Sequence, residues 1–186
     1  SALAPLGQVI APGRPQLGAG LTAVPLEVAS PHGPWQADLL DPARLFERTL
    51  AFSPDVIVYA AAYTAVDEAE QNQATAMVVN AQAPAALAQA AAQCGALLVH
   101  YSTDYVFDGV GTRPWIEADV ARPINIYGRS KLAADQAIMH SGCRHLIFRT
   151  SWVYGRQGRG FLQQMMQLAV RRHCLRVVND QVGAPT

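Results

Sequence analysis

Short, nearly continuous apolar runs alternate with longer segments of helical periodicity along this chain. The runs Asp55–Ala60, Leu97–Ser102 and His145–Arg149 have the composition of parallel strands, and a further strand is expected at Leu175–Val178. Strands that read as continuously apolar are typical of sheets covered on both faces. We therefore expect Asp55–Ala60 to be buried on both sides.

Helix boundaries are marked by capping and breaking residues. Asp41 and Pro42 predict the N-cap and first turn of a helix that runs to about Ala51. The segment Val66–Gln93 is helical in pattern, but Pro84 lacks an N–H and its ring crowds the preceding turn, so the helix should kink or restart there. Further signals place a helix end at Gly95 and helices near Tyr127–His140 and Phe161–His173.

The N-terminal part of the chain is less regular. Ser1–Leu6 reads as the tail of a helix, and Gln8–Ala11 reads as a short strand. Arg14–Trp35 is rich in Pro and Gly, which predicts a long loop or a small excursion from the fold.

The alternation of strands and helices predicts the fold class. We expect an α/β protein with a Rossmann-like, doubly wound parallel sheet and helices on both faces. In such folds the ligand crevice lies at the carboxyl ends of the strands. Candidate chemistry should therefore be sought where the strands end.

Composition excludes several classes of function. The 186 residues are 51% apolar, and 14 Lys plus Arg balance 14 Asp plus Glu, so no basic field favours nucleic acid. The most apolar stretches are too short or too interrupted to span a bilayer. Three separated cysteines suit a reducing, cytoplasmic setting. His100 is expected in the core, and the other histidines lack metal-binding spacing.

Polar or small residues gather at three strand ends, in Ala60–Thr64, Ser102–Tyr105 and Thr150–Tyr154. Downstream of the second, Tyr127 and Lys131 lie one turn apart on a predicted helix, so they share a face. Reduction of a ketone by hydride needs a proton for the developing alkoxide, which a tyrosine can deliver. A nearby ammonium would lower the phenol pKa from its usual value near 10.

Four segments carry a resemblance to a known family. They are Ala60–Glu70, His100–Gly109, Phe148–Tyr154 and Asn179–Thr186. The chain resembles the extended short-chain dehydrogenase/reductases and, within them, the dTDP-4-dehydrorhamnose reductase family. The resemblance runs from about Leu3 to Thr186, apart from Arg14–Trp35.

The resemblance implies an activity and roles for individual residues. The activity would be NADPH-dependent reduction of the C4 ketone of dTDP-4-dehydro-L-rhamnose to dTDP-L-rhamnose, so the substrate would be a dTDP-sugar. A homodimer is a further possibility. Thr103, Tyr127 and Lys131 would form the catalytic triad, with Lys131 also holding the nicotinamide ribose. The cofactor would lie along Asp38, Leu39, Ala60, Ala61, Ala62 and Asn80, and the substrate would contact Thr64, Val66, Tyr105 and Trp152.

The chain departs from the family pattern in three places. The glycine-rich turn that binds pyrophosphate would precede Ser1, and most of the smaller substrate-binding region would follow Thr186. We therefore interpret 1–186 as one NAD(P)-binding domain that is incomplete at both ends. The chain as given is then expected to lack parts that activity requires. Tyr59 stands where relatives usually carry Asn. Arg14 begins the long 14–35 segment and follows Gln8–Ala11, which corresponds to the second strand of the family's fold. An Arg at the end of that strand can receive a 2′-phosphate, which favours NADPH, with NADH as the alternative.

Two other functions remain as alternatives. A relative with the same fold can serve as a non-catalytic, nucleotide-binding regulatory subunit, for which loss of the Tyr/Lys pair would be the sign. A sugar-nucleotide epimerase or dehydratase uses the same triad with tightly held NAD. The retained pair and the segment Ser102–Phe107 favour the reductase.

We expect the 186-residue chain by itself to bind NADPH poorly, because the pyrophosphate half of the pocket depends on the glycine-rich turn. Calorimetric titration, beside a version that includes the family's glycine-rich start, measures this. Micromolar binding by the short chain would instead assign the phosphate site to another segment, most simply Arg14–Trp35.

Overall fold

The computed structural model describes residues 38–154, 160–184 and 186. The expected elements Ser1–Leu6 and Gln8–Ala11 lie outside the described residues, as do the segment Arg14–Trp35 and the cofactor role predicted for Arg14. Among the described residues, no helix combines the length and apolarity needed to cross a membrane.

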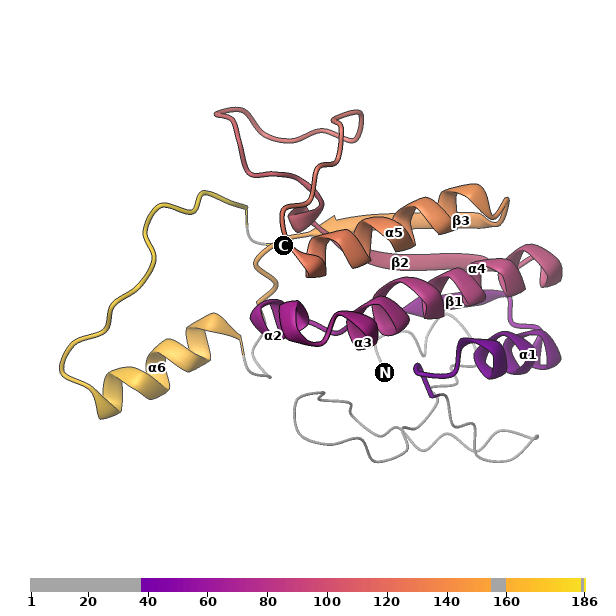
Figure 1. The fold of residues 1–186 in the computed structure, drawn as a ribbon, viewed down its shortest axis with the longest axis horizontal. Coiled ribbons are helices and arrows are strands. Elements are labelled where there is room, and N and C mark those ends of the chain that lie inside the picture. Colours follow the sequence, from indigo (N-terminus) through magenta and orange to yellow (C-terminus); the bar gives the residue numbers. More distant parts are fainter. Residues whose placement is uncertain (1–37, 155–159, 185) are drawn as a thin grey trace.

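Three parallel strands form the sheet, in the order β1 (Val56–Tyr59), β2 (Leu97–Thr103) and β3 (Arg144–Thr150) (Figure 1). Val56 pairs with Leu97, and Leu97 with Arg144, so the strands run in register from these positions. The three strand predictions in this region are confirmed, as is the α/β class with a Rossmann-like parallel sheet. All three carboxyl ends lie at one edge.

Helices α1 (Pro42–Phe52), α4 (Ala83–Cys94) and α5 (Ile126–His140) lie side by side on one face of this sheet (Figure 1). Asp41 caps α1 as predicted, its side chain accepting the Arg44 N–H at 3.0 Å. Gly95, at φ +75°, ends α4 in the left-handed conformation that glycine adopts without strain. The core between sheet and helices includes Leu45, Leu87, Leu98 and Ile138.

The opposite face of the sheet is exposed in the described part of the chain. Val56, Val58, Leu146 and Phe148 are each between 41% and 52% exposed, so the expectation that Asp55–Ala60 is buried on both sides is wrong here. The cause is topological. Successive strands step in one direction, and right-handed crossovers then place every connecting helix on the same face.

The helical segment after β1 is more broken than expected. It contains α2 (Val66–Gln71), α3 (Gln73–Met77) and a π-helical turn (Val78–Gln82) before α4. The restart at Pro84 is confirmed, because Pro84 lies in the first turn of α4, where its missing N–H costs nothing. The additional break at Asn72 was not predicted; there the side-chain Nδ2 donates to the Glu68 carbonyl at 3.2 Å.

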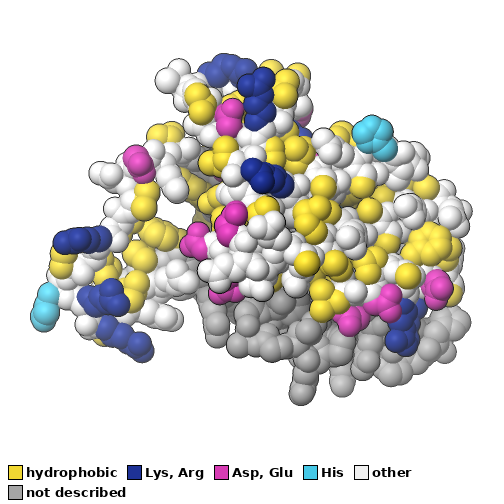
Figure 2. Space-filling model, viewed as in Figure 1, with side chains coloured by type: hydrophobic (Ala, Val, Ile, Leu, Met, Phe, Trp, Pro, Cys, Tyr) yellow, Lys and Arg dark blue, Asp and Glu magenta, His cyan; other side chains and the backbone are white. Residues whose placement is uncertain are grey.

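The C-terminal part matches the expectations in part. Helix α6 (Phe161–Arg171) is confirmed, and it lies apart from the sheet in Figure 1. The strand predicted at Leu175–Val178 is wrong: the segment is irregular, and Val177 and Val178 are exposed. Apolar composition alone does not make a strand, because its N–H and C=O groups need a neighbouring strand. On the face shown in Figure 2, acidic and basic side chains are interspersed.

Asn80 joins the end of β1 to α5. It is fully buried, and its Oδ1 accepts the Tyr63 N–H at 2.7 Å. Its Nδ2 donates to the Tyr63 carbonyl at 3.1 Å and to Ser130 Oγ at 3.0 Å. Ser130 in turn donates to the Tyr127 carbonyl at 2.7 Å. The π-helical turn therefore directs one amide across 50 residues of sequence to the helix that carries Tyr127.

We expect Asn80→Ala to destabilise the protein by about 3 kcal/mol, because each buried group left without a partner costs about 1–3 kcal/mol. Denaturant unfolding measures the change. Asn72→Ala is the matched control, since Asn72 is exposed and its loss should change stability by less than about 0.5 kcal/mol. Equal effects of the two substitutions would contradict the role given to Asn80.

Candidate active site

The three strand ends lie together, as the sequence predicted. Thr150 Oγ1 donates to the Ser102 carbonyl at 3.2 Å, and Ser151 Oγ donates to Asp104 Oδ2 at 2.7 Å, which ties the end of β3 to that of β2. The end of β1 is joined to the same region through Tyr63 and Asn80. Polar side chains from three separate segments thus border one edge of the sheet.

The start of α5 is fixed at this edge by two capping interactions. Asn125 accepts the Gly128 N–H at 2.7 Å, and Glu70 of α2 accepts the Ile126 N–H at 2.8 Å. Gly128 lies so close to the segment that follows β2 that a Cβ at this position would overlap the carbonyl oxygen of Tyr105. The absence of a side chain at Gly128 therefore lets the first turn of α5 approach the residues that follow β2.

Tyr127 lies in that first turn, half-buried beside Thr103 and Tyr105. The Tyr105 ring meets it edge-on, with ring centroids 5.6 Å apart, and the Thr103 side chain is its hydrogen-bond partner. Burial raises the pKa of Tyr127; the Thr103 hydrogen bond opposes this, and Asp104 and Tyr105 add to it. The predicted lowering of this pKa by Lys131 is therefore wrong in this structure.

Lys131 lies one turn further along α5 and is almost completely buried. Its Nζ donates to the Tyr101 carbonyl of β2 at 2.6 Å and lies 3.3 Å from His100 Nε2. Burial lowers the pKa of Lys131 to about 8, while the Asp135 carboxylate acts in the opposite direction. The ammonium thus points toward β2, and Tyr127 lies one turn earlier on the same face of α5.

The residues expected beside the cofactor lie around the end of β1. Asp38 Oδ1 accepts the Leu40 N–H at 2.9 Å in the turn before α1, and Leu39 packs against the cores that contain Tyr59 and Tyr63. Ala60 is exposed, and Ala61 and Ala62 are half-buried. Asn80, in contrast, has both amide hydrogens and its oxygen engaged within the protein.

The residues expected to contact the substrate are spread around the same edge. Thr64 is exposed, Val66 is half-buried at the start of α2, and Tyr105 is 39% exposed against Tyr127. Trp152 is 50% exposed and has a left-handed backbone, φ +47°.

The last residues of the chain also lie at this edge, although no site role is predicted for them from the sequence. Ser151 and Thr186 exchange hydrogen bonds, the Thr186 N–H to the Ser151 carbonyl at 2.9 Å and the Ser151 N–H to Thr186 Oγ1 at 3.0 Å. Gly183 lies against the Trp152 ring, where a Cβ would come within 3.1 Å. Asn179–Thr186 is one of the segments that carry the family resemblance, but the contact of Gly183 with Trp152 is tertiary and has no local signal in the sequence.

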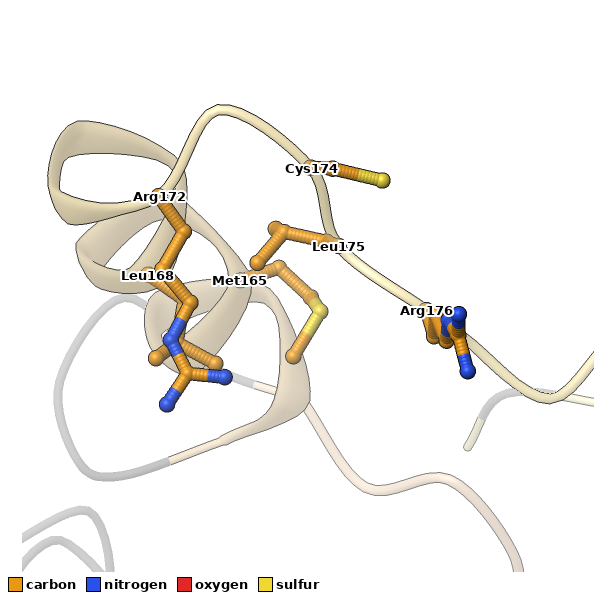
Figure 3. Close-up of a pocket in the computed structure, with 6 residues that line it drawn as sticks. All are labelled: Met165, Leu168, Arg172, Cys174, Leu175 and Arg176. Atoms are coloured by element: carbon orange, nitrogen blue, oxygen red, sulfur yellow. The ribbon is translucent and has the colours of Figure 1, made fainter.

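A separate hollow lies beside α6, lined by Met165, Leu168, Arg172, Cys174, Leu175 and Arg176 (Figure 3). These side chains come from α6 and the segment after it, and none belongs to the strand ends. No cluster of His, Cys, Asp or Glu suited to a metal ion occurs among the residues the structure describes.

The sequence model of the RmlD substrate binding domain matches residues 7–186. The chain is 44% identical over 185 residues to the dTDP-4-dehydrorhamnose reductase of Escherichia coli (strain K12), covering 100% of this chain and 56% of the relative. It is 50% identical over 149 residues to the enzyme of that name from Salmonella typhimurium, covering 80% of this chain and 50% of the relative.

Solved structures agree with the sequence relatives. A dTDP-4-dehydrorhamnose reductase from Clostridium acetobutylicum superimposes with a TM-score of 0.76 at 38% identity, over 80% of this chain and 53% of that one. The corresponding enzyme of Bacillus anthracis, solved with NADP, gives a TM-score of 0.75 at 39% identity over the same shares. The chain spans about half the length of the curated relatives it matches. With the family match running from residue 7 to residue 186, the chain belongs to the RmlD substrate binding domain family.

Proposed function

We propose that the whole protein reduces the C4 ketone of dTDP-4-dehydro-L-rhamnose to dTDP-L-rhamnose with NADPH. The observation that carries the proposal is the grouping of Thr103, Tyr127 and Lys131 at the carboxyl end of β2, in a chain of this family. Relatives that carry the name dTDP-4-dehydrorhamnose reductase, one of them solved with NADP, support it.

The edge of the sheet suits a nucleotide cofactor. Ala60, Ala61 and Ala62 have no side-chain atoms beyond Cβ, so a ligand can approach the backbone at the end of β1 closely. Lys131 would hold the nicotinamide ribose with an ammonium proton, and Asp38 and Leu39 would lie beside the adenine. Asn80 would act indirectly, by fixing Tyr63 and hence the 60–64 segment. When bound, NADPH supplies the hydride.

Tyr127 is the proposed proton donor. Reduction consumes one proton at the ketone oxygen, so the working form of the phenol is the protonated one. Its raised pKa keeps that form populated at neutral pH. As negative charge develops on the substrate oxygen, the Tyr127 O–H donates its proton and becomes a phenolate, which the hydrogen bond with Thr103 favours.

Thr103 and the surrounding residues orient the reacting groups. Thr103 is fixed by the Tyr105 N–H, which donates to its Oγ1 at 3.2 Å, and it is the hydrogen-bond partner of Tyr127. Trp152 would offer an exposed apolar surface and an indole N–H to the sugar. Thr64 and Val66, which follow β1, would contact the sugar from the end of that strand.

The cellular setting and assembly follow as secondary proposals. Cys94, Cys143 and Cys174 are all free thiols in the described part of the chain, which supports a reducing compartment such as the cytoplasm. A homodimer stays a prediction.

Incubation of the whole protein with NADPH and dTDP-4-dehydro-L-rhamnose tests the proposed reaction. We expect loss of NADPH absorbance and formation of dTDP-L-rhamnose, identified by NMR. Binding of nucleotide without turnover would favour a regulatory subunit, and an epimerised or dehydrated product without net NADPH consumption would favour the epimerase or dehydratase alternative.

We expect Tyr127→Phe to lower kcat by about 10² to 10⁴, the usual range for loss of a general acid, while NADPH affinity changes little. Tyr101→Phe is the matched control, because its side chain lies on the exposed face of the sheet against Phe148, away from the site. A kcat for Tyr127→Phe within about twofold of the parent would remove Tyr127 from the mechanism.

Lys131→Ala should impair both turnover and NADPH binding, because the ammonium would hold the nicotinamide ribose and so place the cofactor for hydride transfer. Steady-state kinetics and fluorescence titration with NADPH measure the two effects. Arg129→Ala, an exposed cation on the same helix, should leave both unchanged. Loss of rate with unaltered NADPH affinity would show that the ribose contact is wrong.

A further inference from the structure

Three polar side chains lie buried directly beneath the proposed site, in a core that is otherwise mostly apolar. His100 and Asp135 are fully buried, and Ser102 is 4% exposed. They come from two elements, β2 and α5, that face each other across the core. None of them has a role in the proposed reaction so far.

These side chains form one connected network with Lys131. His100 Nε2 lies 3.3 Å from Lys131 Nζ and 3.8 Å from Asp135 Oδ1. Asp135 Oδ2 accepts a hydrogen bond from Ser102 Oγ at 2.9 Å and another from Arg149 Nε at 3.4 Å. One nitrogen of the imidazole, Nε2, thus faces both the ammonium and a carboxylate that is held from β2 and β3.

The protonation state of His100 follows from its surroundings. Burial and the charge of Lys131 lower the pKa of His100 to about 3, so the ring is neutral at working pH. One nitrogen of a neutral imidazole donates and the other accepts. An ammonium has donors only, so Nε2 facing Lys131 is the acceptor, and the proton lies on Nδ1. The Tyr59 ring, stacked at a centroid distance of 5.9 Å, fixes the plane of the imidazole.

This arrangement is costly to the fold. In the described part of the structure, His100 Nδ1 and Asp135 Oδ1 are buried without hydrogen-bond partners. A buried polar atom left unpaired destabilises a protein, and an apolar side chain of similar volume would avoid the penalty. Stability alone therefore does not account for an imidazole at this place.

We propose that His100 is a positioning residue for Lys131, and that Asp135 supplies the buried counter-charge that keeps the ammonium protonated. The inference rests on the proposed reductase function for its effect on turnover. Two of the three ammonium protons are directed to the Tyr101 carbonyl and His100 Nε2. The third is left for the ligand, in a direction that the other two fix.

The proposal predicts a pH dependence with a definite sign. Lys131 works as an ammonium, so activity falls as the pH rises through its pKa. Burial lowers that pKa and Asp135 raises it. Burial raises the pKa of Asp135 itself, and the Ser102 hydrogen bond from β2 and the charges of Arg149 on β3 and Lys131 on its own helix oppose this. Removing the carboxylate charge must lower the pKa of Lys131 further and move the basic limb of the rate profile to lower pH.

The sequence provides a direct readout of this titration, because Lys131 is the only lysine among the 186 residues. In the whole protein grown with isotope-labelled lysine, the Lys131 signal is assigned by its absence in Lys131→Arg. Its chemical shift followed against pH gives the pKa of the ammonium without reference to turnover. Asp135→Asn should lower that pKa and the basic limb of kcat/KM together, by about one pH unit.

The role of His100 is tested by a matched pair of variants. His100→Gln can place an amide oxygen near the position of Nε2, whereas His100→Leu removes the acceptor and also the unpaired Nδ1. We expect His100→Leu, which leaves one Lys131 ammonium proton without its acceptor, to bind NADPH about tenfold more weakly than the parent, the size of one lost hydrogen bond to a charge. His100→Gln should restore NADPH affinity to within about threefold. Thr49→Val, which removes a buried hydroxyl in α1, should not move the Lys131 signal.

The outcomes separate this proposal from the proposed function. An unchanged Lys131 titration in Asp135→Asn, or equal NADPH affinities of the two His100 variants, overturns the positioning role. A parent protein that does not reduce the keto sugar overturns the reductase function alone, because the titration shift and the NADPH binding pattern are measured without the substrate.

Discussion

The buried ammonium of Lys131 is the feature on which the arrangement of the site depends. A charge removed from water needs acceptors and a counter-charge, and here they come from β2 and from α5 itself. This requirement fixes how far α5 lies from β2 and which face of the helix it presents. Tyr127, one turn earlier on that face, is thereby held next to Thr103.

The rest of the fold supports this pairing of helix and strand. Parallel order brings the ends of β1, β2 and β3 to one edge, and Asn80 links the first of them to α5. Gly128 allows the close approach at the start of the helix. The chemistry assigned to the site thus uses side chains whose positions are each determined by backbone contacts, which limits their freedom before any ligand arrives.

Local signals in the sequence predicted the elements well, and tertiary contacts explain where they failed. Some signals involve residues within one helical turn of each other, so they can be predicted from the sequence. They are the N-cap at Asp41, the helix end at Gly95 and the Tyr127–Lys131 spacing. The contact between His100 and Lys131 joins residues 31 positions apart, and the raised pKa of Tyr127 comes from burial in the folded protein. The strand expected at Leu175–Val178 failed because a strand depends on a partner.

The most direct test of this account is a crystal structure of the whole protein with NADPH bound. The account predicts that Lys131 Nζ keeps its contacts to the Tyr101 carbonyl and His100 Nε2 while its third proton is donated to a ribose hydroxyl of the nicotinamide half. An ammonium that has left β2, or a ribose that is held by other side chains while Lys131 stays buried out of reach, would contradict it.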